Sequence, residues 1–373
     1  MRPLRWLAIV ATVSLGACAH LGLRGDPHPP IVFVHGEGDS AALWQTTIWR
    51  FESNGWPRGR LHAIDVPYPL SRDDDAQARS PTGDPLKALS HEVDRVLART
   101  GARKVVLVGD SRGGDAIRHY LGEGDGATKV SRAILGGAPN DGIGATRLRL
   151  GRSDTVPGLA WLAAPQGPRG FEQIWTFITE QPPSRTAIVA ETAPVLDGRI
   201  SRPGTNLPMA GVRVEVFEVA PQTGERLGPP AHVLTTGADG RWGPMTARSD
   251  APYEFVLSAP GFAITHVYRS AFPRASGIVN MHPTRLADAD RSAGSVVTMT
   301  RPRGYFDLRR DRMSLDGAAL PGVSPGAVGV SEAKLVLPPG PVRTVIAEVN
   351  GERIAVRTWP ASENRAVVAE LHY

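Results

Sequence analysis

Short apolar segments alternate with amphipathic ones over the first half of the chain, and this alternation limits the possible fold more than any other feature. The apolar segments cover residues 31–34, 61–66, 104–108 and 133–135. The run at 31–34 is uninterrupted, as is typical of a strand that is buried on both faces. Strands that alternate with helices form a parallel sheet with helices on both sides. The sequence therefore predicts an α/β domain over residues 26–190.

The segments between these strands show helical spacing. An apolar stripe at Trp44, Ile48 and Phe51 predicts a helix whose N-cap is Asp39 or Ser40. Apolar spacing also predicts helices over residues 86–97 and 116–121. A strand followed by a loop and a helix therefore recurs along this part of the chain, as a parallel sheet requires.

A G-x-S-x-G motif, Gly109-Asp-Ser-Arg-Gly113, joins the third strand to the helix that follows it. Glycines on both sides allow a strained turn on which the hydroxyl of Ser111 stands exposed. The helix that begins there directs backbone amides toward any negative charge that develops near the serine. The chain has no G-K-S/T or G-x-G-x-x-G motif, so a phosphate-binding loop is the weaker interpretation. We expect Ser111 to be a nucleophile.

The loop after the first strand begins with His35 and Gly36. In a site of this kind, the backbone N–H groups of Glu37 and Arg112 are the expected donors to an oxyanion. The side chain of His35 is expected to brace the loop rather than to act in catalysis. No cofactor is expected, and no spacing of His, Cys, Asp or Glu predicts a metal site.

The N-terminal segment, residues 1–18, has the pattern of a signal peptide. Arg2 and Arg5 precede a short apolar stretch that is too short to span a bilayer. Leu15-Gly-Ala-Cys18 then resembles a bacterial lipobox, in which Cys18 is lipidated and becomes the first mature residue. Ala19 in the next position favours an outer-membrane lipoprotein. An ordinary secretory signal, which leads to a periplasmic or secreted protein, is the alternative.

The second half of the chain shows strand-like spacing. Residues 212–219 alternate apolar and polar side chains, and residues 237–242 form a turn signal that ends in Trp242. Residues 195–285 resemble a transthyretin-type, carboxypeptidase regulatory-like sandwich, and residues 286–373 add further strands. The net charge of +5 is not clustered, so nucleic acid is not expected as a partner.

As a whole, the chain resembles α/β-hydrolase lipases of an archaeal type that carry a C-terminal β-rich, lipid-binding region. The residues that support this resemblance are 31–36, 54–57, 109–113, 171–179, 253–255, 268–269 with Phe272, and 345–373. The resemblance implies an α/β-hydrolase core with a parallel sheet, followed by an all-β, sandwich-like C-terminal region. It also implies hydrolysis of carboxylic esters through an acyl-serine intermediate.

A serine nucleophile needs a base, and in this fold the order along the chain is Ser, then Asp or Glu, then His. No histidine lies between His119 and His232. In the lipases that this chain resembles, the catalytic histidine lies on a loop before the helix that corresponds to residues 171–179. In this chain Trp161 takes the position of that histidine. Asp154, or else Asp141, is the candidate acid, and no histidine can be assigned as the base.

Two functions therefore remain open for an ester or lipid ligand. The first is a serine hydrolase of the lipase or esterase type that is anchored to the membrane through its N-terminus. The second is a catalytically impaired homologue that acts as a binding lipoprotein of the cell envelope. A surface adhesin, in which the α/β domain is a spacer, is a weaker third possibility.

Replacement of Cys18 tests the predicted anchor. Because the thiol accepts the diacylglyceryl group, Cys18→Ala should move the protein from the membrane pellet to the soluble fraction. Metabolic labelling with a fatty acid and cell fractionation measure this. An unchanged membrane association of Cys18→Ala would contradict lipidation at this residue.

Overall fold

The computed structural model describes residues 28–36, 38–67, 83–122, 125–136, 159–162, 167–302, 306–309, 311–320, 323–324, 328–330 and 332–372. The predicted signal peptide with Cys18, the expected oxyanion donor Glu37 and the candidate acids Asp141 and Asp154 lie outside these residues. No helix in the described ranges has the length and apolar character needed to cross a membrane.

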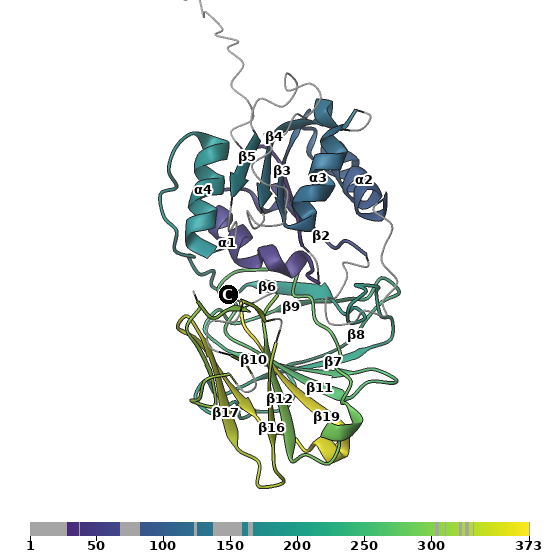
Figure 1. The fold of residues 1–373 in the computed structure, drawn as a ribbon, viewed down its shortest axis with the longest axis vertical. Helices are drawn as coiled ribbons and strands as arrows, with labels where there is room; N and C mark the ends of the chain where they lie inside the picture. The colour runs from purple at the N-terminus through teal and green to yellow at the C-terminus, as the bar shows by residue number, and fades with distance from the viewer. Residues whose placement is uncertain are drawn as a thin grey trace, which may run out of the picture.

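The N-terminal part of the described chain is an α/β unit built on one parallel sheet (Figure 1). Its strands are β1 (Ile31–Val34), β2 (Leu61–Ile64), β3 (Val105–Asp110), β4 (Val130–Gly136) and β5 (Leu159–Leu162). Their order across the sheet is β2-β1-β3-β4-β5. The carboxyl ends of parallel strands share one edge of the sheet, where ligands of α/β proteins gather.

Helices cover both faces of this sheet. The helical elements are η1 (Ala41–Trp44), α1 (Gln45–Ser53), η2 (Arg58–Arg60), α2 (Gly83–Thr100), α3 (Arg112–Gly122), η3 (Gly126–Lys129) and α4 (Gly167–Thr179). One apolar core joins α2 and α3 to one face, with Val93 and Ile117 at its centre. A second core joins α1 and α4 to the other face through Phe51 and Phe171. Successive apolar residues of β1 therefore enter opposite cores, as Val32 and Phe33 do.

The predicted parallel α/β core is confirmed, and β1 has the bounds that the sequence indicates. One expectation about this unit is wrong. Residues 159–162 were expected on a loop, but they form the edge strand β5, in which Trp161 pairs with Leu135 of β4. This short apolar segment extends the sheet by one parallel strand, a pairing that local sequence does not indicate.

The rest of the described chain is a β-region with a seven-stranded mixed sheet. Its order is β16-β12-β19-β11-β10-β7-β8. These strands are β7 (Arg213–Glu218), β8 (His232–Thr235), β10 (Tyr253–Ser258), β11 (Ile264–Arg269), β12 (Ser295–Thr300), β16 (Ala333–Leu337) and β19 (Arg365–Glu370). Strand β19 pairs in parallel with both β11 and β12. The sheet thus combines strands of the two expected regions, 195–285 and 286–373.

Two smaller sheets pack on opposite faces of this large sheet. They are formed by β6 (Val195–Arg199) with β9 (Arg241–Thr246), and by β14 (Met313–Leu315), β17 (Thr344–Val349) and β18 (Glu352–Arg357). A short pair, β13 (Phe306–Asp307) with β15 (Val328–Val330), and the turns η4 (Asp288–Asp290) and η5 (Ala361–Glu363) complete the described elements. The expected all-β, sandwich-like region is confirmed, because separate apolar cores fill the two faces.

Helix α1 lies between the two units (Figure 1). Trp49 of α1 belongs to the apolar core of the β-region, and its indole N–H donates to the carbonyl of Ala275 at 2.9 Å. Beside it, the Glu52 carboxylate pairs with Arg58 of its own unit and with Arg274 of the β-region. The β-region is therefore packed directly against the helix that follows the first βα loop.

The pH dependence of stability should reveal His62 on β2. Burial, together with the positive charges of Arg99 and Arg95, lowers the pKa of His62 to about 4, against the opposing carboxylate of Glu92. An unfolded histidine titrates near a pKa of about 6.5, so acid adds a proton to the unfolded chain first. The free energy of unfolding should therefore fall as the pH falls from about 6.5 to about 4.

Thermal unfolding of wild type, His62→Gln and His119→Gln between about pH 7 and about pH 5 measures this effect, expected as a loss of ~2–5 °C in wild type. His62→Gln should lose less, whereas His119→Gln, which changes an exposed residue of α3, should behave as wild type does. An equal loss in wild type and His62→Gln would contradict the assignment.

Candidate active site

Ser111 stands at the sharp corner between β3 and α3. Its φ of 48° lies in the left-handed region, which residues other than glycine seldom adopt. The backbone N–H of Ser111 donates to the carbonyl of Gly136 at 2.8 Å, and its carbonyl accepts from the N–H of Gly114 at 2.8 Å. These bonds fix the corner to the end of β4 and to the first turn of α3. This strained strand-to-helix turn is the conformation that the motif predicts.

The two glycines of the motif are required because backbone meets backbone around the corner. A Cβ at Gly109 would lie 2.6 Å from the carbonyl carbon of Gly113. A Cβ at Gly113 would lie 2.4 Å from the carbonyl oxygen of Val34 in β1. Carbon atoms do not approach oxygen that closely without a bond, so side chains at these positions would push α3 away from the sheet.

The described residues of the loop that follows β1 lie beside Ser111, and we call residues 36 and 38–40 the oxyanion loop after the role expected for it. The position of a Cβ on Gly36 is 3.2 Å from Cβ of Ser111 and 3.4 Å from Oδ2 of Asp39. A buried carboxylate therefore lies on the same side of this loop as the serine. Asp39 was considered from the sequence only as a helix cap, and the side chain of Ser40 makes that cap by accepting from the N–H of Ala42. The signal for Asp39 was its place just after a strand, at the edge where ligands gather.

His35 braces this loop through both ring nitrogens. Its Nε2 accepts from the N–H of Val66 at 2.8 Å, which requires the proton to be on Nδ1. Nδ1 then donates to the carbonyl of Gly36 at 2.8 Å. Burial lowers the pKa of His35, although the carboxylate of Asp65 opposes this. A neutral ring with both nitrogens engaged holds the backbone and does not accept a proton from Ser111.

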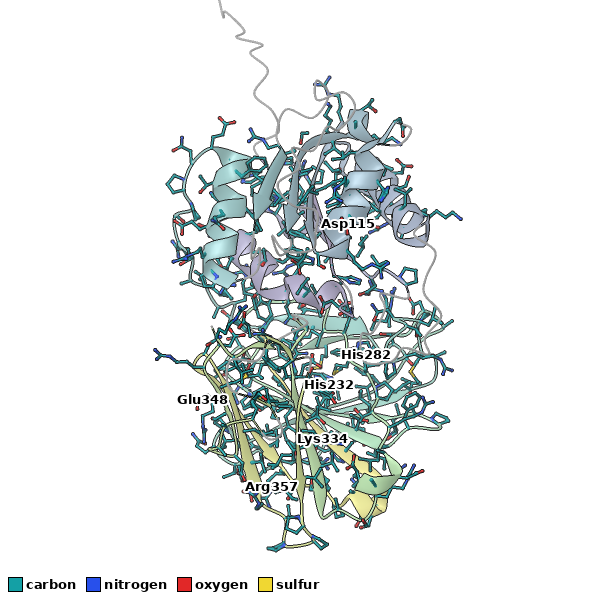
Figure 2. The ribbon with its side chains drawn as sticks, viewed as in Figure 1. Asp115, His232, His282, Lys334, Glu348 and Arg357 are labelled. Carbon is teal, nitrogen blue, oxygen red and sulfur yellow. The ribbon has the colours of Figure 1, made fainter. Side chains whose placement is uncertain are left out.

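Three of the other described histidines, His232, His266 and His282, belong to the β-region. His266 of β11 is buried, where Nδ1 lies 2.6 Å from the Glu254 carboxylate and the ring stacks on Trp359 at 4.3 Å. Figure 2 shows Asp115 on α3 of the α/β unit, and His232 and His282 among the strands of the β-region. Among the described residues, none forms a hydrogen bond with the hydroxyl of Ser111.

Of the predicted site residues, the structure describes Ser111 and Arg112. Arg112 is the first residue of α3, so its backbone N–H lies at the N-terminus of that helix, next to the serine. Glu37, Asp154 and Asp141 lie outside the described residues, and their roles stay predictions. Trp161 lies in β5, as noted above, and not on the loop where the family histidine was expected.

Two cavities lie where the units meet. One of about 380 Å³ is lined by Asp65 at the end of β2 and by Arg199 and Asn280 of the β-region. The other, of about 610 Å³, is lined by residues that include Trp49, Pro168 and His372. Ser111 lines neither of them. Asp65, which lines the first cavity, also accepts a hydrogen bond from the N–H of Ala41, the residue that follows the oxyanion loop.

Two family models match parts of the chain. Residues 28–143 match the family model of class 2 lipases, and residues 193–286 match that of the lipase C-terminal domain. The solved structures that the chain resembles include naproxen esterase from Bacillus subtilis, with 21% identity over 29% of this chain and 34% of that one, at a TM-score of 0.22.

Carboxylesterase CesB from Bacillus subtilis is 22% identical over 30% of this chain and 36% of its own, at a TM-score of 0.21. A lipase-esterase related protein from Clostridium acetobutylicum is 16% identical over 31% of this chain and 44% of its own, at a TM-score of 0.22. The chain thus covers less than half of the length of each of these three proteins. The two family matches, together with the corner at Ser111, place the chain in the α/β-hydrolase-fold lipase and esterase family, with a lipase C-terminal domain.

Proposed function

We propose that the protein hydrolyses carboxylic esters with Ser111 as the nucleophile. The observation that carries this proposal is the left-handed φ of Ser111 at a strand-to-helix corner, which presents the hydroxyl at the carboxyl edge of the sheet. A strained backbone of this kind persists only where the surrounding structure enforces it, and such residues cluster at active sites. The match to class 2 lipases over residues 28–143 supports an ester as the substrate.

The reaction would proceed in two halves. The Ser111 oxygen bonds to the ester carbonyl carbon and gives up its proton, and the carbonyl oxygen becomes an oxyanion. The N–H of Arg112 and that of Glu37 would donate to this oxyanion. Collapse breaks the bond to the alkoxy group, which takes a proton and leaves as the alcohol. Water then adds to the acyl-serine and releases the carboxylic acid and the free serine.

We propose that the carboxylate of Asp39 is the base that accepts the proton of Ser111. This side chain and the Cβ of Ser111 are both within 3.4 Å of the point that a Cβ on Gly36 would occupy. Catalytic hydrogen bonds are often long before substrate binds and shorten in the complex. In this scheme Asp39 takes the proton during attack and returns it to the leaving alkoxy oxygen, so no proton is gained or lost. Asp154 stays the acid that the sequence predicts.

The alternative is that the chain is a binding lipoprotein that has kept the fold. The observation that favours it is the absence, within the described residues, of a histidine in contact with Ser111. Serine without a base is a poor nucleophile at neutral pH. For both functions we propose an exported protein that is anchored to the outer membrane through lipidated Cys18, with an ester or lipid as its ligand.

A fluorophosphonate probe tests the nucleophile. The probe forms a bond from phosphorus to an activated serine oxygen and releases fluoride, so wild type should be labelled and Ser111→Ala should not. Ser53→Ala is the control, because that hydroxyl donates to the carbonyl of Trp49 in α1. Hydrolysis of a short-chain nitrophenyl ester should follow the labelling. Folded wild type that is neither labelled nor active would exclude the hydrolase and favour the binding lipoprotein.

Replacement of Asp39 tests the base. Asp39→Asn keeps the shape of the side chain and removes the proton acceptor, so the rate of labelling and kcat should each fall by about 100-fold or more. Asp115→Asn, which removes an exposed carboxylate from the first turn of α3, should change neither by more than about twofold. Near-normal kcat in a folded Asp39→Asn would show that another group accepts the proton.

A further inference from the structure

We propose that Asn206 of the β-region is a positioning residue that holds the oxyanion loop in place beside Ser111. The side chain of Asn206 reaches this loop from the segment between β6 and β7. The inference deepens the proposed function and rests on it, since it concerns the same serine. It assigns the β-region a part in the reaction that neither the family match nor the sequence pattern indicates.

The direct contact is with the backbone of the oxyanion loop. The Nδ2 group of Asn206 donates to the carbonyl of Asp39 at 2.7 Å, across 167 residues of sequence. Asn206 itself is buried, with 7% of its surface exposed, so water does not compete freely for this bond. The bond therefore fixes the main chain of the residue that we propose as the base.

The same amide also reaches the other end of the loop. Nδ2 of Asn206 lies 3.4 Å from the carbonyl of Val66, in the segment that follows β2. The N–H of Val66 donates to His35, whose ring in turn donates to the carbonyl of Gly36. A continuous set of hydrogen bonds thus links Asn206 to Gly36 and to Asp39, two residues of the loop beside Ser111.

The backbone around Asn206 is itself held in one conformation. Its φ is 53°, in the left-handed region, where asparagine is one of the few residues that fit readily. The N–H of Arg202 donates to the carbonyl of Leu207 at 2.8 Å, and the N–H of Asn206 donates to the carbonyl of Arg202 at 3.2 Å. This tight turn presents the amide from a fixed position, as a positioning group requires.

A second contact supports the end of the loop where η1 begins. The Asp65 carboxylate accepts from the N–H of Ala41 at 2.7 Å. Two side chains of the β-region hold that carboxylate: Nδ2 of Asn280 lies 3.0 and 3.1 Å from its oxygens, and Arg199 lies 3.4 Å away. The β-region therefore determines the position of the loop at two points, one directly and one through Asp65.

Such support matters because an oxyanion hole works only when its donors are already in place. A displacement of well under about 1 Å removes much of the effect, since the donors must meet the oxygen at hydrogen-bond distance in the transition state. Loss of the Asn206 amide should therefore slow the chemical step more than it weakens substrate binding.

The test compares Asn206→Gly with Asn364→Gly. Glycine keeps the left-handed φ and removes the amide, so the turn should survive. Asn364 is the matched control, because it also has a left-handed φ, of 54°, and its side chain contacts Phe262 and Arg291 within the β-region. Measured for each protein are kcat and KM for a short-chain ester, the melting temperature, and the hydrogen exchange of the segment 38–44 by mass spectrometry.

We expect Asn206→Gly to lower kcat by about tenfold or more, to change KM by less than about threefold, and to speed exchange in segment 38–44. Asn364→Gly should leave kcat and that exchange unchanged. An unchanged kcat in Asn206→Gly overturns the proposal, and so does an equal loss of kcat in both variants, which would reflect stability alone. If wild type is inactive and unlabelled, the proposed function fails. Exchange then decides separately whether Asn206 holds the loop, and unchanged exchange overturns that as well.

Discussion

The close approach of three backbone segments around Ser111 is the constraint on which the rest of the site depends. Gly113 of α3 packs against the carbonyls of Val34 and His35, and Gly36 packs against Ser111 itself. No side chain fits between α3 and β1, and a side chain at Gly36 would press on Ser111, so these segments lie close together. The left-handed φ of Ser111 is a consequence of that packing, because the chain must leave β3 and enter α3 within a single residue.

This arrangement explains why the β-region is not simply an additional domain. None of the described residues of the loop beside Ser111 belongs to an apolar core. Its carbonyl groups need hydrogen-bond donors. His35 satisfies one from within the α/β unit, and Asn206 satisfies another from the β-region. Trp49, which inserts into the apolar core of the β-region, keeps the two units in register so that the asparagine can reach. Apolar packing thus holds the two units rigidly together, and this allows the polar contacts to position the loop.

Local sequence was sufficient to predict the central strands of the α/β unit and the strand-to-helix turn at Ser111. The apolar run at 31–34 is typical of a buried strand, and the G-x-S-x-G motif at 109–113 is typical of a strand-to-helix turn. The strand at 159–162 was missed because an edge strand of four residues has too little pattern to distinguish it from a loop. The pairing of β19 with β11 joins strands about 100 residues apart, and periodicity within either strand says nothing about its partner.

The polar contacts of the site could not be predicted either, because local sequence does not identify a partner that is distant along the chain. Asn206 and Asp65 lie in segments whose sequence indicates only a turn and a strand end. Their partners in the other unit, Asp39 and Asn280, are 167 and 215 residues away. The role of each appears only when the two units are placed together.

The central claim is that the hydroxyl of Ser111 becomes acylated. Brief reaction with a nitrophenyl ester, acid quenching and peptide mapping test it most directly, because trypsin should release Ser111 in the peptide 105–112. We predict an acyl adduct on Ser111 in this peptide that forms rapidly and disappears as the substrate is consumed. Acylation of another residue, or turnover without an adduct on this peptide, would contradict the account.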